Sequence, residues 1–112
     1  VFGHHGVSAY DMATILTAEG VVTEWAWQNP HTSLTLTIAQ DGTSATVEIE
    51  GAPLRWMEEQ GWTAGSLTAG DIVTITYHPR RSGERYTGIL MEVQRANGAV
   101  LKVNRPARLG GP

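Results

Sequence analysis

The chain has 112 residues, 41% of them hydrophobic, and a formal net charge of −3, which suits one small domain with a modest core. A slightly acidic chain is not typical of nucleic-acid binders, and no apolar run approaches the roughly 18 residues of a membrane span. The absence of Cys excludes disulfides, cysteine-zinc sites and thiol nucleophiles. We therefore expect chemistry from imidazoles, carboxylates, hydroxyls or guanidinium groups.

The first half of the chain predicts three strands. Residues 15–27 are rich in β-branched and aromatic residues, as in a long strand, and Asn-Pro at 29–30 ends it. Residues 31–39 and 45–50 alternate apolar and polar side chains with a period of two, which indicates strands with one buried face. The Asp-Gly pair at 41–42 between them is typical of a hairpin turn.

The second half predicts a short helix and then two or three strands. Pro53 suits the first turn of a helix over residues 52–60, and Gly61 suits its C-terminal cap. Residues 104–112 hold two Pro and two Gly, and we expect them to form a flexible tail. The remaining strands are expected at residues 72–78, 86–94 and 99–103.

Three strands, a short helix and further strands is the element order of an OB-fold, a small Greek-key barrel. We therefore predict an all-β protein with one short helix, an OB-fold-like barrel of five to six strands, as a single domain over residues 1–103. An open β-sandwich or another small barrel is the alternative. Closure removes exposed sheet edges, which suits strands that carry many Thr and few charges.

The histidines are the residues best suited to chemistry. A two-residue turn at 41–42 places Ser33 opposite Glu50, so His31 is expected to lie diagonal to Glu50 on the polar face. Neutral imidazole is the commonest ligand of zinc and copper, and a carboxylate can complete or orient the set. The pattern predicts a site for copper or zinc with the candidate ligands His4, His5, His31, Glu50 and His78.

These residues also have simpler interpretations. A histidine on a polar strand face is often only a surface residue, and His31 after Asn-Pro can hydrogen-bond the turn backbone. Glu50 can be a solvated strand residue, and whether His78 reaches the other two depends on how the barrel closes.

A small metal-independent lyase, isomerase or hydratase is the alternative function. His31 and Glu50 would then be the catalytic acid–base pair, and His5 with Asp11 is a second such pair. A non-catalytic accessory subunit is the third hypothesis. No phosphate loop or dinucleotide fingerprint is present, so no nucleotide cofactor is expected.

Two further groups are candidates for binding a ligand. Trp25 and Trp27 share one face of the first strand and can line a pocket, with core packing as the alternative. Arg80 and Arg81 lie in a basic turn with Arg85 and can grip a carboxylate or phosphate, with a solvated loop as the alternative.

A series of short motifs occurs in order along the chain. They are His-His-Gly at 4–6, Gly-Val-Val at 20–22, Trp-Gln-Asn-Pro-His at 27–31, Glu-Gly at 50–51, Gly-Trp at 61–62 and Leu-x-x-Gly-Asp-x-Val-Thr at 67–74. In this order they resemble the family of small exported bacterial proteins known as domain of unknown function 6152. The resemblance spans about residues 4–103, and its most specific parts are the His-His pair and the Trp-x-Asn-Pro-His run.

The resemblance implies export to the periplasm or beyond, because such proteins typically carry a signal peptide that ends close to the His-His pair. Its recurring polar positions fall on His4, His5, Asn29, His31 and Glu50, which adds Asn29 to the ligand-binding candidates. Residues 1–3 precede the pair here, so a copper site built on a terminal amine is not expected. The expected partner is a metal ion or small molecule, with a homo-oligomer or a partner enzyme subunit as further options.

Overall fold

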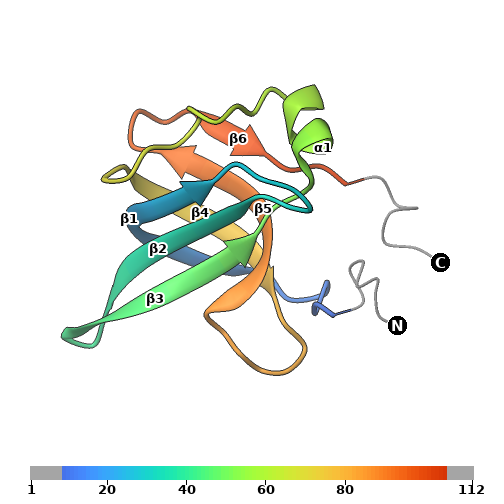
Figure 1. Ribbon diagram of the computed structural model, residues 1–112. Coiled ribbons are helices and arrows are strands. Elements are labelled where there is room, and N and C mark those ends of the chain that lie inside the picture. The colour runs from blue at the N-terminus through green and yellow to red at the C-terminus, as the bar shows by residue number, and fades with distance from the viewer. Residues whose placement is uncertain (1–8, 106–112) are drawn as a thin grey trace.

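The structure is a computed structural model that describes residues 9–105. Within these residues the elements follow the predicted order, and each lies within two residues of its predicted range (Figure 1). They are β1 (Leu16–Ala26), β2 (Ser33–Gln40), β3 (Thr43–Glu50), α1 (Leu54–Glu59), β4 (Ile72–Pro79), β5 (Thr87–Arg95) and β6 (Val100–Lys102).

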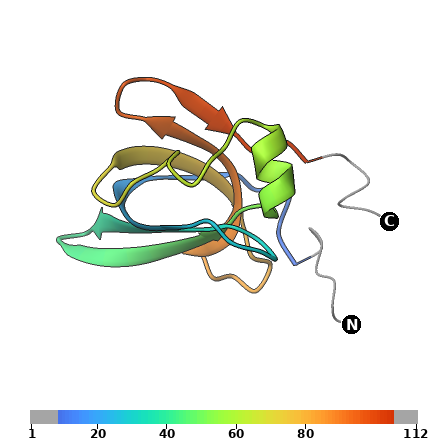
Figure 2. The ribbon, with the colours of Figure 1, turned by 45° about the horizontal axis from the view of Figure 1, so that its top comes forward.

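Five of the strands close into a barrel, which confirms the predicted fold class. β1 pairs antiparallel with β2 and β4, β2 with β3, and β4 with β5. A short parallel pairing of β3 with β5 completes the ring, and β6 adds an extra strand to β5. Figure 2 shows the strands wrapped around a common centre, so the barrel leaves β3 and β5 without the free edges of an open sandwich.

The inward-facing residues of the alternating strands form the core. Leu36 faces Val47, and Leu34 faces Ile49 across the β2–β3 pair, and all four side chains are buried. Each such side chain contributes roughly 1.5–3 kcal/mol when it leaves water. The helix α1 follows β3 and covers one end of the barrel (Figure 2), where its Met57 is fully buried.

Gly88 lets β5 cross closely over β4. A Cβ atom at this position would lie 2.3 Å from the carbonyl oxygen of His78, which is closer than any real contact. The glycine is therefore required by the close approach of two backbones rather than by its own torsion angles. This crossing lies beside the parallel β3–β5 pairing, where Ile49 pairs with Gly88.

The segment before β1 lies against the end of β4. Tyr10 forms a bridge with Arg80, and the backbone N–H of Asp11 donates to the carbonyl of Pro79 at 2.8 Å. The N–H of Arg81 in turn donates to the carbonyl of Ala9 at 2.9 Å. This short added strand places the Tyr10 side chain beside the last residue of β3.

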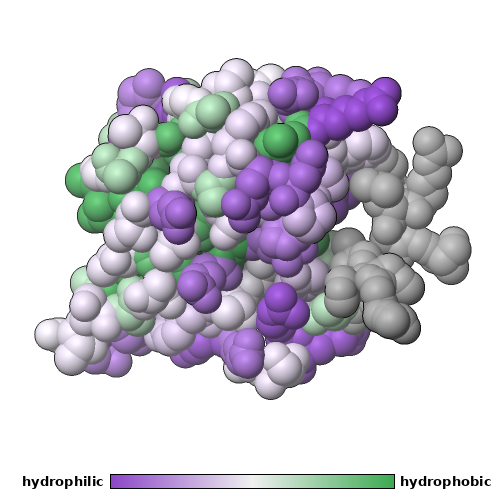
Figure 3. All heavy atoms as spheres, viewed as in Figure 1, coloured by the Kyte–Doolittle hydropathy of each residue, from purple (hydrophilic) through white to green (hydrophobic). Residues whose placement is uncertain are grey.

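The face of the molecule seen in Figure 3 is mostly polar or neutral, with hydrophobic residues gathered toward its left side. Val21 and Ile72 are cross-strand partners on β1 and β4, and they are 41% and 55% exposed. Within residues 9–105, no helix has the length and apolar character needed to cross a membrane.

Candidate functional site

His31 and Glu50 lie side by side, as the sequence predicts. Asp41 and Gly42 both have positive φ angles, 51° and 83°, as a two-residue type I′ turn requires. The turn sets the register in which Ser33 pairs with Glu50. His31, two residues before Ser33, then brings its Nε2 to 3.5 Å from Glu50 Oε1. The two side chains are 37% and 30% exposed, so ligands can reach them.

The backbone fixes which nitrogen of His31 faces the carboxylate. His31 Nδ1 lies 3.1 Å from the carbonyl oxygen of Thr32, and a carbonyl only accepts, so Nδ1 carries the proton and donates. In the neutral ring, Nε2 then presents a lone pair to Glu50. Two acceptors that face each other at 3.5 Å repel unless a proton or another cation lies between them. When Nε2 is protonated as well, the two side chains form an ion pair.

Tyr10 contacts the same oxygen of Glu50 as His31 does. Its phenol Oη donates to Glu50 Oε1 at 3.1 Å. Burial, together with the negative charge of Glu50, raises the pKa of Tyr10 to about 12. The hydroxyl therefore stays protonated and keeps its role as a donor to the carboxylate.

Arg105 supplies a positive charge to the same group of residues. Burial lowers the pKa of Arg105 to about 10, while the charges of Glu50 and Tyr10 act to raise it. Its Nη1 donates to the carbonyl of Leu90 at 2.7 Å, and its Nη2 is buried without a hydrogen-bond partner. Sequence reasoning missed both Tyr10 and Arg105, because they lie outside the predicted strands and no local pattern marks them.

A pocket of about 240 Å³ opens beside the pair. Arg80, a predicted ligand-binding residue, lines it, and the guanidinium carbon of Arg80 lies 5.2 Å from the centre of the Tyr10 ring. Arg81, the other predicted arginine, is not among the lining residues. The lining is His31, Ser33, Glu48, Ile49, Glu50, Arg80, Thr87 and Gly88.

His78 lies apart from the pair. In the closed barrel, Ile89 of β5 pairs with Glu50 of β3 on one side and with His78 of β4 on the other. The backbones of His78 and Glu50 are therefore separated by two strand spacings, or roughly 10 Å. Its side chain is buried, and Nδ1 lies 2.9 Å from the carbonyl of Thr14, to which it donates. The imidazole thus fastens the segment before β1 to β4.

Of the predicted metal ligands that the structure describes, only His31 and Glu50 come together. Within residues 9–105, no three His, Asp or Glu side chains come together as a cluster that could hold an ion. His4 and His5 lie outside the described residues. Asp11, predicted as a partner of His5, accepts hydrogen bonds from the Thr14 hydroxyl at 2.6 Å and the Ala13 N–H, and these bonds lower its pKa.

A comparison with protein families identifies the chain. A family model matches residues 1–90. The chain belongs to the family of unknown function DUF6152. Comparison with curated proteins and with solved structures gave no match. The region that matches the DUF6152 model contains Tyr10, His31, Glu50 and Arg80. It ends before Arg105, so Arg105 comes from the chain beyond the matched region.

The aromatic candidates of this DUF6152 protein make packing contacts. The Trp25 ring lies 5.9 Å from that of Trp27 and 5.4 Å from that of Trp62, centre to centre. Its indole N–H donates to the carbonyl of Thr63 at 3.1 Å. Asn29 Oδ1 accepts a hydrogen bond from the N–H of Leu54 at the start of α1. These contacts hold α1 and the segment after it against β1, and a ligand role for the three residues stays a prediction.

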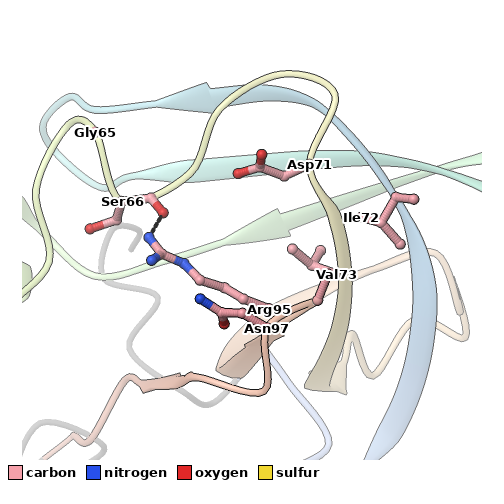
Figure 4. Close-up of a pocket in the computed structure, with 8 residues that line it drawn as sticks. Gly65, Ser66, Asp71, Ile72, Val73, Arg95 and Asn97 are labelled. Carbon is pink, nitrogen blue, oxygen red and sulfur yellow. Dashed lines mark hydrogen bonds between the residues drawn. The ribbon is translucent and has the colours of Figure 1, made fainter.

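A second pocket of about 400 Å³ lies between residues 65–73 and 95–97 of the DUF6152 chain (Figure 4). Its charged groups are bonded to the backbone of loops. The Arg95 guanidinium donates to the carbonyl of Ser66, and Asp71 Oδ2 accepts from the N–H of Thr68 at 2.9 Å. None of the residues predicted from the sequence as site residues lines this pocket.

Proposed function

We propose that this small β-barrel of the DUF6152 family binds a divalent transition-metal ion, zinc or copper, through His31 Nε2 and Glu50 Oε1. The observation that carries the proposal is the 3.5 Å separation of these two acceptors. Two ligands at about 2.0–2.1 Å from one zinc ion, at a tetrahedral angle, are roughly 3.3–3.4 Å apart. The pair therefore already has nearly the spacing that one ion requires.

The surroundings of the pair support the same proposal. Histidines that bind metals almost always donate their second ring N–H to a carboxylate, a backbone carbonyl or water, and His31 donates to the carbonyl of Thr32. Ligating carboxylates are themselves hydrogen-bonded, and Glu50 accepts from Tyr10. Both proposed ligands are thus oriented before any ion arrives.

Two ligands do not complete a tetrahedral site. We propose His4 and His5 as sources of a third ligand, since they are the remaining histidines of the predicted set. A position left open would take water or an external ligand from the pocket. The proposed place of action is the periplasm or the outside of the cell, as the resemblance to exported proteins implies.

Isothermal titration of the metal-free protein with Zn(II) and with Cu(II) tests the proposal. We expect binding of one ion per chain, and at least a hundredfold weaker affinity in both His31→Ala and Glu50→Gln. The matched control is Glu58→Gln on α1, which removes the same charge from an exposed residue outside the pocket. His4→Ala and His5→Ala then show which of the two histidines contributes a ligand.

Two results would overturn the metal proposal. One is the absence of binding for both ions in the unmodified chain. The other is an affinity in His31→Ala and Glu50→Gln equal to that of Glu58→Gln. After either result, the alternative in which the same pair acts as an acid and a base without metal would be the next to test.

A further inference from the structure

We propose that the open end of the barrel binds a small aromatic carboxylate, with Arg85 as the group that holds the carboxylate. The site is a third pocket, of about 380 Å³, which shares no lining residue with the two pockets described above. Residues 16–19 of β1, residues 38–40 of β2, Tyr77 of β4 and the loop residues Arg85 and Tyr86 line it. The proposal is independent of the proposed metal site.

The pocket lies where β1 and β2 separate. The two strands are paired as far as Val21 and Thr37. Beyond this pair, residues 16–20 of β1 pair with β4, and residues 38–40 of β2 pair with β3. The pocket is therefore near the turn that joins β2 to β3, whereas α1 begins after the far end of β3 and covers the opposite end of the barrel (Figure 2). The mouth of a β-barrel is a common place for a ligand site.

The walls of this pocket are largely apolar and aromatic. Ile38 and Tyr77 belong to the buried core, and the partly buried Leu16, Ala18 and Tyr86 pack against it. No Phe, Tyr or Trp lines either of the two pockets described above. Ligand sites of about 300–1,000 Å³ typically have such walls, and the volume of about 380 Å³ is within this range. A ligand ring would leave water here and pack against tyrosine rings.

Arg85 is the positive group of the pocket, and its loop is held in place. The Tyr77 hydroxyl donates to the backbone carbonyl of Arg85 at 2.7 Å. The guanidinium carbon of Arg85 lies 5.5 Å from the centre of the Tyr86 ring, which stabilises the cation. Burial raises the pKa of Tyr77, and the charge of Arg85 acts to lower it, so the guanidinium lies near the phenol. A guanidinium held in this way can bind a carboxylate through two parallel hydrogen bonds.

The charge of Arg85 is available to a ligand. Among residues 9–105, no carboxylate forms an ion pair with Arg85. Glu19 also lines the pocket, but it is exposed and its charge is solvated by water. A neutral aromatic ligand would gain the apolar contacts and leave Arg85 without a counterion, whereas an aromatic carboxylate supplies both. A second carboxylate on the ligand would add a like charge to a pocket that already contains Glu19, so one carboxylate is expected.

Isothermal titration with phenylacetate, in the presence of EDTA, tests the proposal without any contribution from a metal ion. Phenylacetamide keeps the ring without the charge, and acetate keeps the charge without the ring. We expect one phenylacetate per chain, bound at least about fivefold more tightly than either, which is the upper range for one exposed ion pair. Arg85→Gln should remove the preference over phenylacetamide. The matched control, Arg55→Gln on α1, removes the same charge from an exposed side chain and should keep the preference.

A second variant tests the location. Ala39→Trp places a large side chain at the exposed rim of the pocket and should weaken the binding of phenylacetate and phenylacetamide at least tenfold. Urea unfolding shows whether each variant is folded, and Arg85→Gln decides the result if Ala39→Trp is not. The proposal is overturned if phenylacetate does not bind saturably or is not preferred to both probes. It is equally overturned if Arg85→Gln keeps the preference, or if folded Ala39→Trp binds as tightly as the unmodified chain.

Discussion

Two pockets of this barrel use their charged residues in different ways. In the pocket of about 400 Å³, Arg95 donates to the carbonyl of Ser66, and Asp71 accepts from the N–H of Thr68. In the pocket of about 240 Å³, the charged and polar side chains contact one another, as His31 and Glu50 do at 3.5 Å. The charged groups of the larger pocket therefore hold loops together, whereas those of the smaller pocket pair with each other.

This difference indicates that pocket size alone is a poor guide to function. A charged group bonded to a backbone carbonyl or N–H contributes to stability, because breaking the bond leaves a polar group without a partner. A pair of acceptors that face each other contributes little to stability, and a proton or another cation between them supplies the missing partner. Variants in the two pockets should therefore separate stability from binding.

The largest expected effect on stability comes from the larger pocket. Arg95→Ala removes a charged hydrogen bond to the Ser66 carbonyl, and we expect it to lower the free energy of unfolding by about 2 kcal/mol in urea titration. Zinc affinity should stay within twofold. Arg55→Ala, at an exposed pair within α1, is the control and should cost at most about 0.5 kcal/mol. Unchanged stability in Arg95→Ala would remove the distinction between the pockets.

The next effect concerns zinc affinity in the smaller pocket. Tyr10→Phe removes the hydroxyl that donates to Glu50 Oε1, so the carboxylate loses part of its orientation. We expect about tenfold weaker zinc binding by titration, at the lower end of the range for partners of metal ligands. Tyr86→Phe deletes the same atom from a ring that does not line this pocket. Equal affinities in the two variants would contradict a positioning role for Tyr10.

The smallest effect is a pH dependence of stability from the same tyrosine. The raised pKa means that between about pH 10 and pH 12 the hydroxyl ionises in the unfolded chain but not in the folded one. The contribution of the Tyr10 hydroxyl to the free energy of unfolding is therefore complete below pH 10. It is lost as the pH rises from about 10 to about 12. From pH 9 to pH 11, the stability advantage of the unmodified chain over Tyr10→Phe should shrink by about 1 kcal/mol.

Urea unfolding at the two pH values measures this difference. Arg105, whose pKa is lowered, contributes in the opposite direction over the same range, and it does so in both proteins. Its contribution therefore largely cancels when the two proteins are compared. An advantage that stays constant from pH 9 to pH 11 would show that Tyr10 is not buried against Glu50 in solution.

The His31–Glu50 pair was predictable because it depends on local rules. The Asp41-Gly42 turn sets the pairing of β2 with β3, and the period of two assigns each residue to a face. The strand order also followed from local patterns, since each range could be recognised by itself. Closure of the barrel matched the OB-fold that this order suggested, but the parallel pairing of β3 with β5 is a tertiary contact.

The rest of the site was not predictable from local pattern. Tyr10 and Glu50 are 40 positions apart, and His78 and Thr14 are 64 apart. These contacts exist only because the segment before β1 lies across the closed barrel. The sequence expected residues 104–112 to form a tail, yet Asn104 bonds to Gln60 and Arg105 to Leu90. The boundary between domain and tail stays a prediction, because residues 106–112 lie outside the described part.

The sequence by itself determined the strands, the helix, the hairpin register and the neighbourhood of His31 and Glu50, because short-range periodicity and turn geometry set all of these. Tertiary structure alone decided that His78 fastens a segment instead of joining the pair, and that Tyr10, Arg80 and Arg105 surround Glu50. The physical reason is barrel closure. It sets the distance between strands that are remote in sequence and brings both ends of the described chain to one carboxylate.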